Sequence, residues 1–263
     1  MKEDSMGGSN RRRERRVDAA VTPSGPRRPD PKPAWRETFD SWGGYPIFLS
    51  LAAIVAVVAV LIYMNRPGST TGKAAYAPIA RTTVNGKIVG NPDAPVKIIE
   101  FADFQCPFCK QWFDGTEPKL LEEFLNKGTV SLQFVSFAFL GDDSRRAAAA
   151  AECAADQNRF WDYHDLLFKR QGSENTGVFS NANLKKFGAE LKQHFSDFDT
   201  TKFNKCVDSG EKLPNVDADT KQGKAAGVNS TPTFLVNGAT VSGVQSIETF
   251  RQVIQTAQAA LPK

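Results

Sequence analysis

Residues 96–113 read VKIIEFADFQCPFCKQWF, and this stretch decides the fold. Its first six residues form a short run of β-branched and aromatic side chains, which is typical of a buried central strand. Two cysteines follow, Cys106 and Cys109, at positions i and i+3. Residues 107–126 are typical of a helix that ends before Gly128, although Pro118 is expected to kink or restart it. The stretch therefore predicts a strand, then a cysteine pair at the start of a helix.

The position of Cys106 favours an ionised thiol. Pro107 suits the first helical position, so Cys106 is expected at or just before the helix N-terminus. There its sulfur faces unpaired backbone N–H groups and the positive end of the helix dipole. A stabilised thiolate is both the attacking species and a good leaving group in thiol-disulfide exchange. The sequence thus indicates redox chemistry at the Cys106–Cys109 pair.

Two other interpretations of the cysteine pair are less well supported. A structural zinc ion needs four ligands, and the remaining cysteines and histidines of the chain show no matching spacing: Cys153, Cys206, His164 and His194. A purely structural bridge across two residues would constrain little of the unfolded chain. We expect no metal, and no cofactor beyond a redox-active disulfide.

The rest of the folded part continues the α/β pattern. A weak strand (84–89) precedes the quoted stretch, and an alternating strand (130–139) follows it. Five short helices are predicted between 142 and 227. Residues 232–243 then indicate a hairpin with Asn237 and Gly238 at its turn, and a capped helix begins at Ser246. This order predicts one α/β domain interrupted by a helical insertion.

Three motifs in the right order resemble the DsbA-type branch of the thioredoxin superfamily, which includes DsbA- and BdbD-like proteins. They are VKIIEFADFQCPFCKQWF, AAECAADQNRFWDYHDLLF within the helical segment, and GVNSTPTFLVNG downstream. The resemblance covers residues 92–263. It implies a thioredoxin fold with an inserted helical domain, in agreement with the segment order.

The resemblance also implies roles for four residues. Cys106 matches the exposed nucleophile of the family and Cys109 its buried resolving partner. Pro232, directly after Thr231, matches the cis-proline loop, where extended backbone lies beside the disulfide and a substrate chain can pair with it. An ordinary turn before a strand is the alternative interpretation of Thr231 and Pro232.

Glu100 matches a buried acidic position of the family. A buried carboxylate is costly without a partner, so a proton-handling role beside Cys109 is plausible; the alternative is an acid at a strand edge that reaches water. The sequence departs from the best-known oxidases at Phe108, where those enzymes often carry histidine, so we expect a less extreme potential. Phe108 and Trp112 are candidates for a client-binding surface, although Trp112 could equally belong to the core.

Cys153 and Cys206 fall on different predicted helices of the insertion. Outside the cytosol we interpret them as a structural disulfide, and a second redox relay is the alternative. Neither histidine is a catalytic candidate: His164 suits a helix packing face and His194 a solvated one.

Upstream of this domain, residues 47–64 contain no charge and would span roughly 27 Å as a helix, enough to cross a membrane. Residues 1–46 carry ten Lys and Arg, which predicts that this segment is cytoplasmic and that the catalytic domain lies outside the cytoplasmic membrane. Its composition, rich in Arg, Pro, Gly and Ser, predicts a disordered tail. Residues 65–83 are predicted to be a linker and 84–263 the folded domain. A buried core helix, or a signal peptide cleaved near residues 75–77, are the alternatives.

The predicted function is an extracytoplasmic bacterial thiol-disulfide oxidase that introduces disulfides into secreted proteins. The expected partners are reduced or misfolded secreted proteins and a membrane reoxidase of the DsbB or VKOR type, which the resemblance implies. A net charge of +4 over 263 residues, without a nucleic-acid-binding motif, argues against nucleic acid. A reductase or isomerase on the same scaffold, or a redox-inert chaperone-like module, remain open, since CPFC does not set the direction of exchange.

Overall fold

A computed structural model describes residues 49–58 and 76–262 of the chain. Contacts divide the chain into two units, residues 1–69 and 70–263. In the first, residues 49–58 are helical and exposed. No helix within the described ranges is long and apolar enough to cross a membrane. The predicted span at 47–64 lies only partly within these ranges, and the predicted tail at 1–46 lies outside them.

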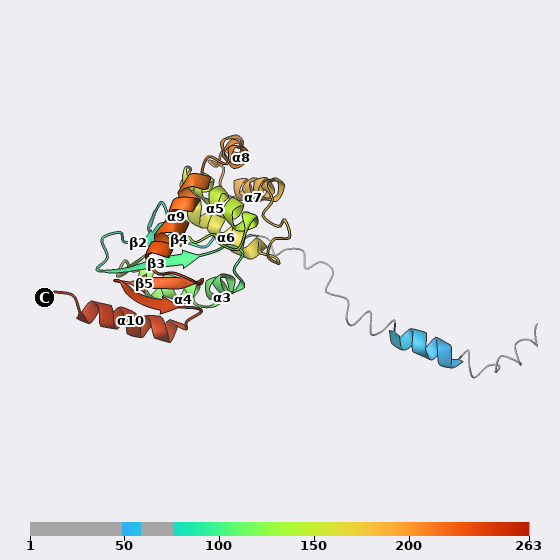
Figure 1. Ribbon diagram of the computed structural model, residues 1–263, viewed down its shortest axis with the longest axis horizontal. Coiled ribbons are helices and arrows are strands. Elements are labelled where there is room, and N and C mark those ends of the chain that lie inside the picture. The colour runs from blue at the N-terminus through green and yellow to red at the C-terminus, as the bar shows by residue number, and fades with distance from the viewer. Residues whose placement is uncertain (1–48, 59–75, 263) are drawn as a thin grey trace, which may run out of the picture. The chain divides into compact units, whose positions relative to one another are not determined.

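A six-stranded mixed sheet in the order β1-β2-β4-β3-β5-β6 forms the centre of the second unit (Figure 1). The central strand β3 (Val96–Ala102) pairs in parallel with β4 (Val130–Ser136) and antiparallel with β5 (Thr233–Val236). A strand paired on both edges, with helices over both faces, buries most of its side chains. This explains the largely apolar run that predicted a central strand, in which Lys97 is exposed and Glu100 is buried.

The weak strand predicted at 84–89 is in fact a tight hairpin of two strands, β1 (Val84–Asn85) and β2 (Ile88–Gly90). Its turn contains Gly86 at φ +57°, a conformation that glycine adopts without steric cost. Strand β2 pairs antiparallel with β4. Strand β4 ends at Ser136, three residues earlier than expected.

The helix predicted over 107–126 is divided into α3 (Pro107–Gly115), α4 (Glu117–Leu120) and a π-helical turn η1 (Leu121–Leu125). The break falls at Thr116. Proline has no N–H for the helix ladder, and its ring clashes with the carbonyl four residues earlier, so Pro118 is tolerated only in the first turn of a new helix. The expected restart at Pro118 is confirmed.

The helical insertion contains the five expected helices. They are α5 (Asp142–Ala155), α6 (Phe160–Arg170), α7 (Asn181–His194), α8 (Thr200–Ser209) and α9 (Leu213–Ala225). A disulfide between Cys153 and Cys206 joins α5 to α8 across 53 positions of sequence. The bridge expected from the sequence is therefore present in the structure.

The β structure resumes with β5 and β6 (Ala239–Ser242), and α10 (Ile247–Ala259) completes the chain. Asn237 and Gly238 both have positive φ, as the hairpin turn requires. The Ser246 hydroxyl caps α10 by accepting from the Thr249 amide at 3.4 Å. Both predicted features of this segment are confirmed.

Helices cover the two faces of the sheet differently. Helix α9 lies along β4, and α10 lies against β3 and β5 (Figure 1). The close approach of α9 depends on Gly223, since a Cβ there would come within 2.5 Å of the Phe137 ring and 3.1 Å of Phe101. On the α10 side, Phe250 packs against Phe234 of β5 at 5.0 Å between ring centroids. The thioredoxin fold with a helical insertion, as predicted, places α3 at the edge of this core.

Candidate active site

The two cysteines of the CPFC motif stand at the start of α3. Cys106 is the N-cap residue, with extended backbone, and Pro107 takes the first helical position, as expected. Both cysteines are free thiols in this structure. Cys109 is completely buried, in agreement with its expected position. Cys106 is only 5 % exposed, so the expectation of an exposed nucleophile is wrong for this form of the protein; the outward residue is Phe108, at 59 %.

The environment separates the pKa values of the two thiols. The pKa of Cys106 is lowered from 9.0 to about 6. The largest cause is a hydrogen bond from the Cys109 thiol, and smaller contributions come from the Thr231 side chain and from the backbone amides of Cys109 and Phe108. Burial raises the pKa, but these hydrogen bonds together have the larger effect. Burial raises the pKa of Cys109 well above its usual value, and the hydrogen bond to Cys106 adds to this. The backbone amides at the helix start help to lower the pKa of Cys106, as the sequence predicts, but the Cys109 thiol lowers it most.

The loop before β5 lies directly against Cys106. The peptide bond between Thr231 and Pro232 is cis, as the resemblance implied. As a thiol, Cys106 donates from Sγ to the Thr231 carbonyl oxygen at 3.3 Å. Thr231 is buried, and its hydroxyl has no hydrogen-bond partner among the described residues. That hydroxyl is therefore available to the sulfur once Cys106 becomes a thiolate.

Glu100 is buried in the middle of β3, with 1 % of its surface exposed. The strand-edge interpretation, in which the carboxyl reaches water, is therefore wrong. Burial raises the pKa of Glu100 well above its usual value, and the nearby Glu117 raises it further. A negative charge on Glu100 makes a smaller contribution in the same direction to the raised pKa of Cys109.

Trp112 is a core residue, so its assignment to a client-binding surface is wrong. Its ring is completely buried and packs against Phe234 at 4.8 Å and Phe250 at 6.0 Å between centroids. Cys109, Trp112 and Phe113 share the buried face of α3, because residues three and four apart lie on one side of a helix. Phe108 lies off this face, which is why one aromatic residue is exposed and the other is buried.

A second exposed aromatic residue, Phe139, was missed by the sequence analysis. It is 44 % exposed, and its amide donates to Asp103 Oδ2 at 3.0 Å. Asp103 in turn accepts at Oδ1 from the Gln105 amide at 2.8 Å and the Ser144 hydroxyl at 2.6 Å. Asp103 therefore connects the approach to Cys106 with the loop after β4 and the first turn of α5.

Gln171, at the end of α6, is also positioned on this approach. Its side-chain amide donates to the carbonyl oxygens of Phe104 at 2.7 Å and Cys106 at 3.0 Å. Gln171 lies 65 positions from Cys106, so no local pattern could reveal the contact. The insertion therefore holds the backbone that leads into the redox pair.

The folded unit extends upstream of Val84, where the sequence analysis placed its start. Tyr76 is 2 % exposed, and its hydroxyl donates to the Asp162 carbonyl oxygen at 3.0 Å. Arg81 makes buried ion pairs with Asp165 at 2.8 Å and Glu117 at 3.1 Å. The last part of the predicted linker is therefore packed against α6 and α4.

Two groups of side chains within the described residues come close enough to share a metal ion, and neither is a convincing site. In the first, Glu117, His164 and Asp165, the Arg81 guanidinium already pairs with both carboxylates. In the second, which Asp156, Cys206 and Glu211 form, the Cys206 sulfur is bound in the disulfide. His164 is completely buried, as its predicted packing position requires.

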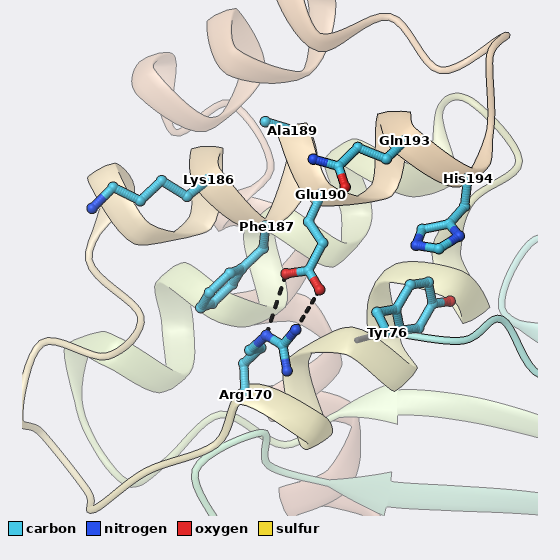
Figure 2. Close-up of a pocket in the computed structure, with 8 residues that line it drawn as sticks. All are labelled: Tyr76, Arg170, Lys186, Phe187, Ala189, Glu190, Gln193 and His194. Carbon is cyan, nitrogen blue, oxygen red and sulfur yellow. Dashed lines mark hydrogen bonds and ion pairs between the residues drawn. The ribbon is translucent and has the colours of Figure 1, made fainter. Parts of the chain in front are cut away.

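A pocket of about 510 Å³ is lined by Tyr76 and by residues of α6 and α7 (Figure 2). Figure 2 shows Tyr76 beside His194, with ring centroids 5.3 Å apart, and an ion pair between Arg170 and Glu190. Its lining comes from α6, α7 and the segment at Tyr76, and includes no residue of α3 or of the loop before β5. The redox pair is therefore not part of this pocket.

Comparisons with known proteins agree with this arrangement. A family model described as thioredoxin matches residues 82–256. The disulfide bond formation protein D of Bacillus subtilis is 31% identical over 173 residues, covering 64% of this chain and 75% of that protein. A probable disulfide bond formation protein D of Bacillus anthracis is 29% identical over 194 residues, covering 73% and 86%.

Among solved structures, oxidised BdbD from Bacillus subtilis superposes with a TM-score of 0.61 at 25% identity, covering 70% of this chain and 99% of that one. The matched region contains the sheet, the CPFC pair, the helical insertion and the cis-proline loop. The chain belongs to the thioredoxin family, on its DsbA-type branch, and is a protein thiol-disulfide oxidoreductase.

Proposed function

We propose that this protein is an extracytoplasmic oxidase that introduces disulfides into secreted proteins through Cys106 and Cys109. The observation that carries the direction is the lowered pKa of Cys106, about 6. At pH 7 this thiolate outnumbers its thiol roughly tenfold, which stabilises the reduced enzyme by about 1.4 kcal/mol, or roughly 30 mV toward an oxidising potential. A more stable reduced form gives a disulfide that is more readily transferred to a client.

In the proposed reaction a client thiolate attacks Cys106 Sγ of the oxidised enzyme. The bond between Cys106 and Cys109 breaks, its electron pair passes to Cys109, and a mixed disulfide forms between Cys106 and the client. The second client thiolate then attacks the client sulfur of that mixed disulfide. Cys106 leaves as a stabilised thiolate, the client is oxidised, and the enzyme is reduced by two electrons.

Three neighbouring groups support these steps. Glu100 is buried and contributes to the raised pKa of Cys109, and it would supply the proton that the leaving Cys109 thiolate needs. The backbone at Thr231 and Pro232 lies beside Cys106, where an extended client segment could pair with it. Exposed Phe108, with Phe139 on the loop after β4, offers apolar contact to unfolded polypeptide.

The location of the protein in the membrane is part of the same proposal. An uncleaved span at 47–64, with the basic residues 1–46 on the cytoplasmic side, would hold the catalytic domain at the outer face of a bacterial cytoplasmic membrane. There a membrane reoxidase of the DsbB or VKOR type would accept the two electrons from the reduced pair. No further cofactor enters this scheme, because the disulfide itself carries the electrons.

The decisive test is oxidation of a reduced, unfolded model protein by the pre-oxidised enzyme. Cys106→Ala removes the attacked sulfur, so turnover should fall to the uncatalysed rate; retained turnover would refute the proposal. The Cys106–Cys109 potential in a glutathione titration decides the direction. A potential near that of thioredoxin, about −270 mV, would favour a reductase. Client-holding activity that survives loss of both cysteines would favour a chaperone-like module.

A further inference from the structure

One buried carboxylate holds the turn between β3 and α3. Asp103 is 1 % exposed. Its Oδ1 accepts from the Gln105 amide at 2.8 Å and from the Ser144 hydroxyl at 2.6 Å. Its Oδ2 accepts from the amides of Phe139 at 3.0 Å and Leu140 at 3.2 Å. The turn after β3 and the loop after β4 are therefore joined to the two oxygens of a single side chain.

The partners of Asp103 fit an ionised carboxylate. Both groups at Oδ2 are backbone N–H groups, which can only donate. At Oδ1, the Ser144 hydroxyl accepts from Gln105 Nε2 at 2.9 Å, so its single proton is free for Asp103. Burial raises the pKa of Asp103, and the hydrogen bonds from Ser144 and the three backbone amides limit that rise. A protonated carboxyl would bring one more donor to a site whose neighbours already donate.

A simple turn cap does not account for this arrangement. The bond from the Gln105 amide spans two positions and is the ordinary Asx turn that aspartate forms before a helix. The bonds from Phe139, Leu140 and Ser144 span 36, 37 and 41 positions. A local cap needs none of these three bonds. The side chain therefore links segments that are distant in sequence.

The main chain of Asp103 meets both cysteines of the redox pair. Its carbonyl oxygen accepts from the Cys106 amide at 3.0 Å. Burial raises the pKa of Cys109, and a backbone hydrogen bond from Asp103 opposes part of this rise. Because the carboxylate is held from several directions, the backbone to which it is attached has little freedom. The anchored side chain thus fixes the main chain that contacts both cysteines.

The loop after β4 carries an exposed aromatic ring whose position also depends on Asp103. Phe139 is 44 % exposed, and its ring packs against Phe137 at 5.2 Å between centroids. Its amide is one of the donors to the carboxylate. The next residue, Leu140, donates to the same oxygen, and its carbonyl oxygen accepts from Asn175 Nδ2 at 2.7 Å. The ring proposed for client contact is therefore connected to the turn before α3.

We propose that Asp103 is a positioning residue for thiol-disulfide exchange: its carboxylate holds the turn before Cys106 and the loop of Phe139 in one fixed arrangement. A client bound at the loop then meets a sulfur whose own hydrogen bonds are in place. The inference rests on the proposed function and deepens it, because it names the residue through which client contact and thiol reactivity are joined. The side chain of Asp103 acts through the backbone of its neighbours rather than on a reacting atom.

The first test is the thiolate titration of Cys106 in the reduced full chain. Asp103→Asn keeps the shape of the side chain but replaces one acceptor oxygen by an NH2 group, so two of the four donors lose their acceptor. The turn should then relax, and the donors to the sulfur should move away from it. The midpoint of the titration, near pH 6 in the wild type, should rise by roughly one unit.

The matched control for this titration is Asp199→Asn at the start of α8. The Asp199 carboxylate also accepts from two backbone amides, those of Thr201 at 2.8 Å and Lys202 at 3.0 Å. This variant should leave the Cys106 midpoint unchanged. A midpoint that does not move in Asp103→Asn, or that rises equally in both variants, would overturn the inference.

A double-mutant comparison tests the link to the client. The probe is a reduced dithiol peptide that carries leucine beside one cysteine. Phe139→Ala should raise the peptide concentration for half-maximal oxidation by the pre-oxidised full chain roughly fivefold. In the Asp103→Asn background the same change should have an effect of less than about twofold, because the loop is no longer held. An equal effect in both backgrounds, or no effect in either, contradicts the inference.

Ser144→Ala tests the same inference if Asp103→Asn does not fold. It removes one donor from Asp103 Oδ1 and leaves the three amide bonds, so the Cys106 midpoint should rise by roughly half a unit. An unmoved midpoint in Ser144→Ala would then overturn the inference. Failure of the proposed function is a different result: the wild-type chain would not oxidise the peptide, whereas the thiolate titration would still report on Asp103.

Discussion

The two cysteine pairs of this chain consist of the same side chains, but their surroundings in the fold differ. Cys106 and Cys109 are free thiols at the start of a helix, where hydrogen bonds lower the pKa of one sulfur and burial raises that of the other. Cys153 and Cys206 are bonded to each other between α5 and α8, 53 positions apart. Hydrogen-bond donors around a sulfur favour exchange, whereas a long closed loop favours stability. The position of each pair in the fold thus determines whether it takes part in thiol-disulfide exchange or stabilises the structure.

The largest expected effect comes from removing one sulfur of the first pair. Cys109→Ala, treated with an oxidised client, should retain the mixed disulfide at Cys106, because the resolving thiol is absent. Non-reducing electrophoresis would detect the trapped complex. The matched variant Cys106→Ala should trap nothing. Equal trapping by both variants would show that the two sulfurs are not differentiated as their pKa values indicate.

The second pair should affect stability and little else. Replacing Cys153 and Cys206 by alanine opens a 53-residue loop, which the chain-entropy relation values at about 4 kcal/mol of unfolding free energy. Denaturant titration measures this loss. Thiolate absorbance at Cys106 should still titrate near pH 6 in the variant. A large shift of that titration would mean that the two pairs are coupled.

The pH dependence of the reduced protein should follow from Cys106. Its folded pKa, about 6, lies below the value of 9.0 for an unperturbed thiol, so the thiolate contributes stability at high pH. This contribution is fully present above about pH 9 and is lost as pH falls through 6. At pH 7 it amounts to about 1.4 kcal/mol. Unfolding of the Cys106→Ala variant, which lacks the thiol, should show a correspondingly weaker dependence between pH 6 and 9.

The smallest effect should come from the Thr231 hydroxyl. Thr231→Val removes a donor to the Cys106 thiolate, and one hydrogen bond to a charged group is worth about 1.5 kcal/mol, so the pKa of Cys106 should rise by up to roughly one unit. The rate of alkylation against pH measures this shift. Thr256→Val on α10, where the hydroxyl bonds only to its own helix, is the control. An unchanged midpoint in Thr231→Val would exclude the hydroxyl as a donor.

Much of the fold was predictable because its signals are local. The buried run at 96–101, the proline that starts α3, the Asn237–Gly238 turn and the Ser246 cap each act within a few residues. The hairpin at β1 and β2 was missed because each strand has only two or three residues. Strands this short carry too little periodicity to be distinguished from one continuous strand.

Local sequence by itself determined that two sulfurs stand one turn apart at a helix start, and this position already favours exchange. Only the tertiary structure decided which groups surround them: Gln171 reaches Cys106 across 65 positions, and Arg81 reaches Asp165 across 84. It also decided that Trp112 is buried while Phe108 is exposed. The physical reason is that backbone propensities and caps act between near neighbours in sequence, whereas burial and electrostatics depend on distances in space that only the packed chain defines.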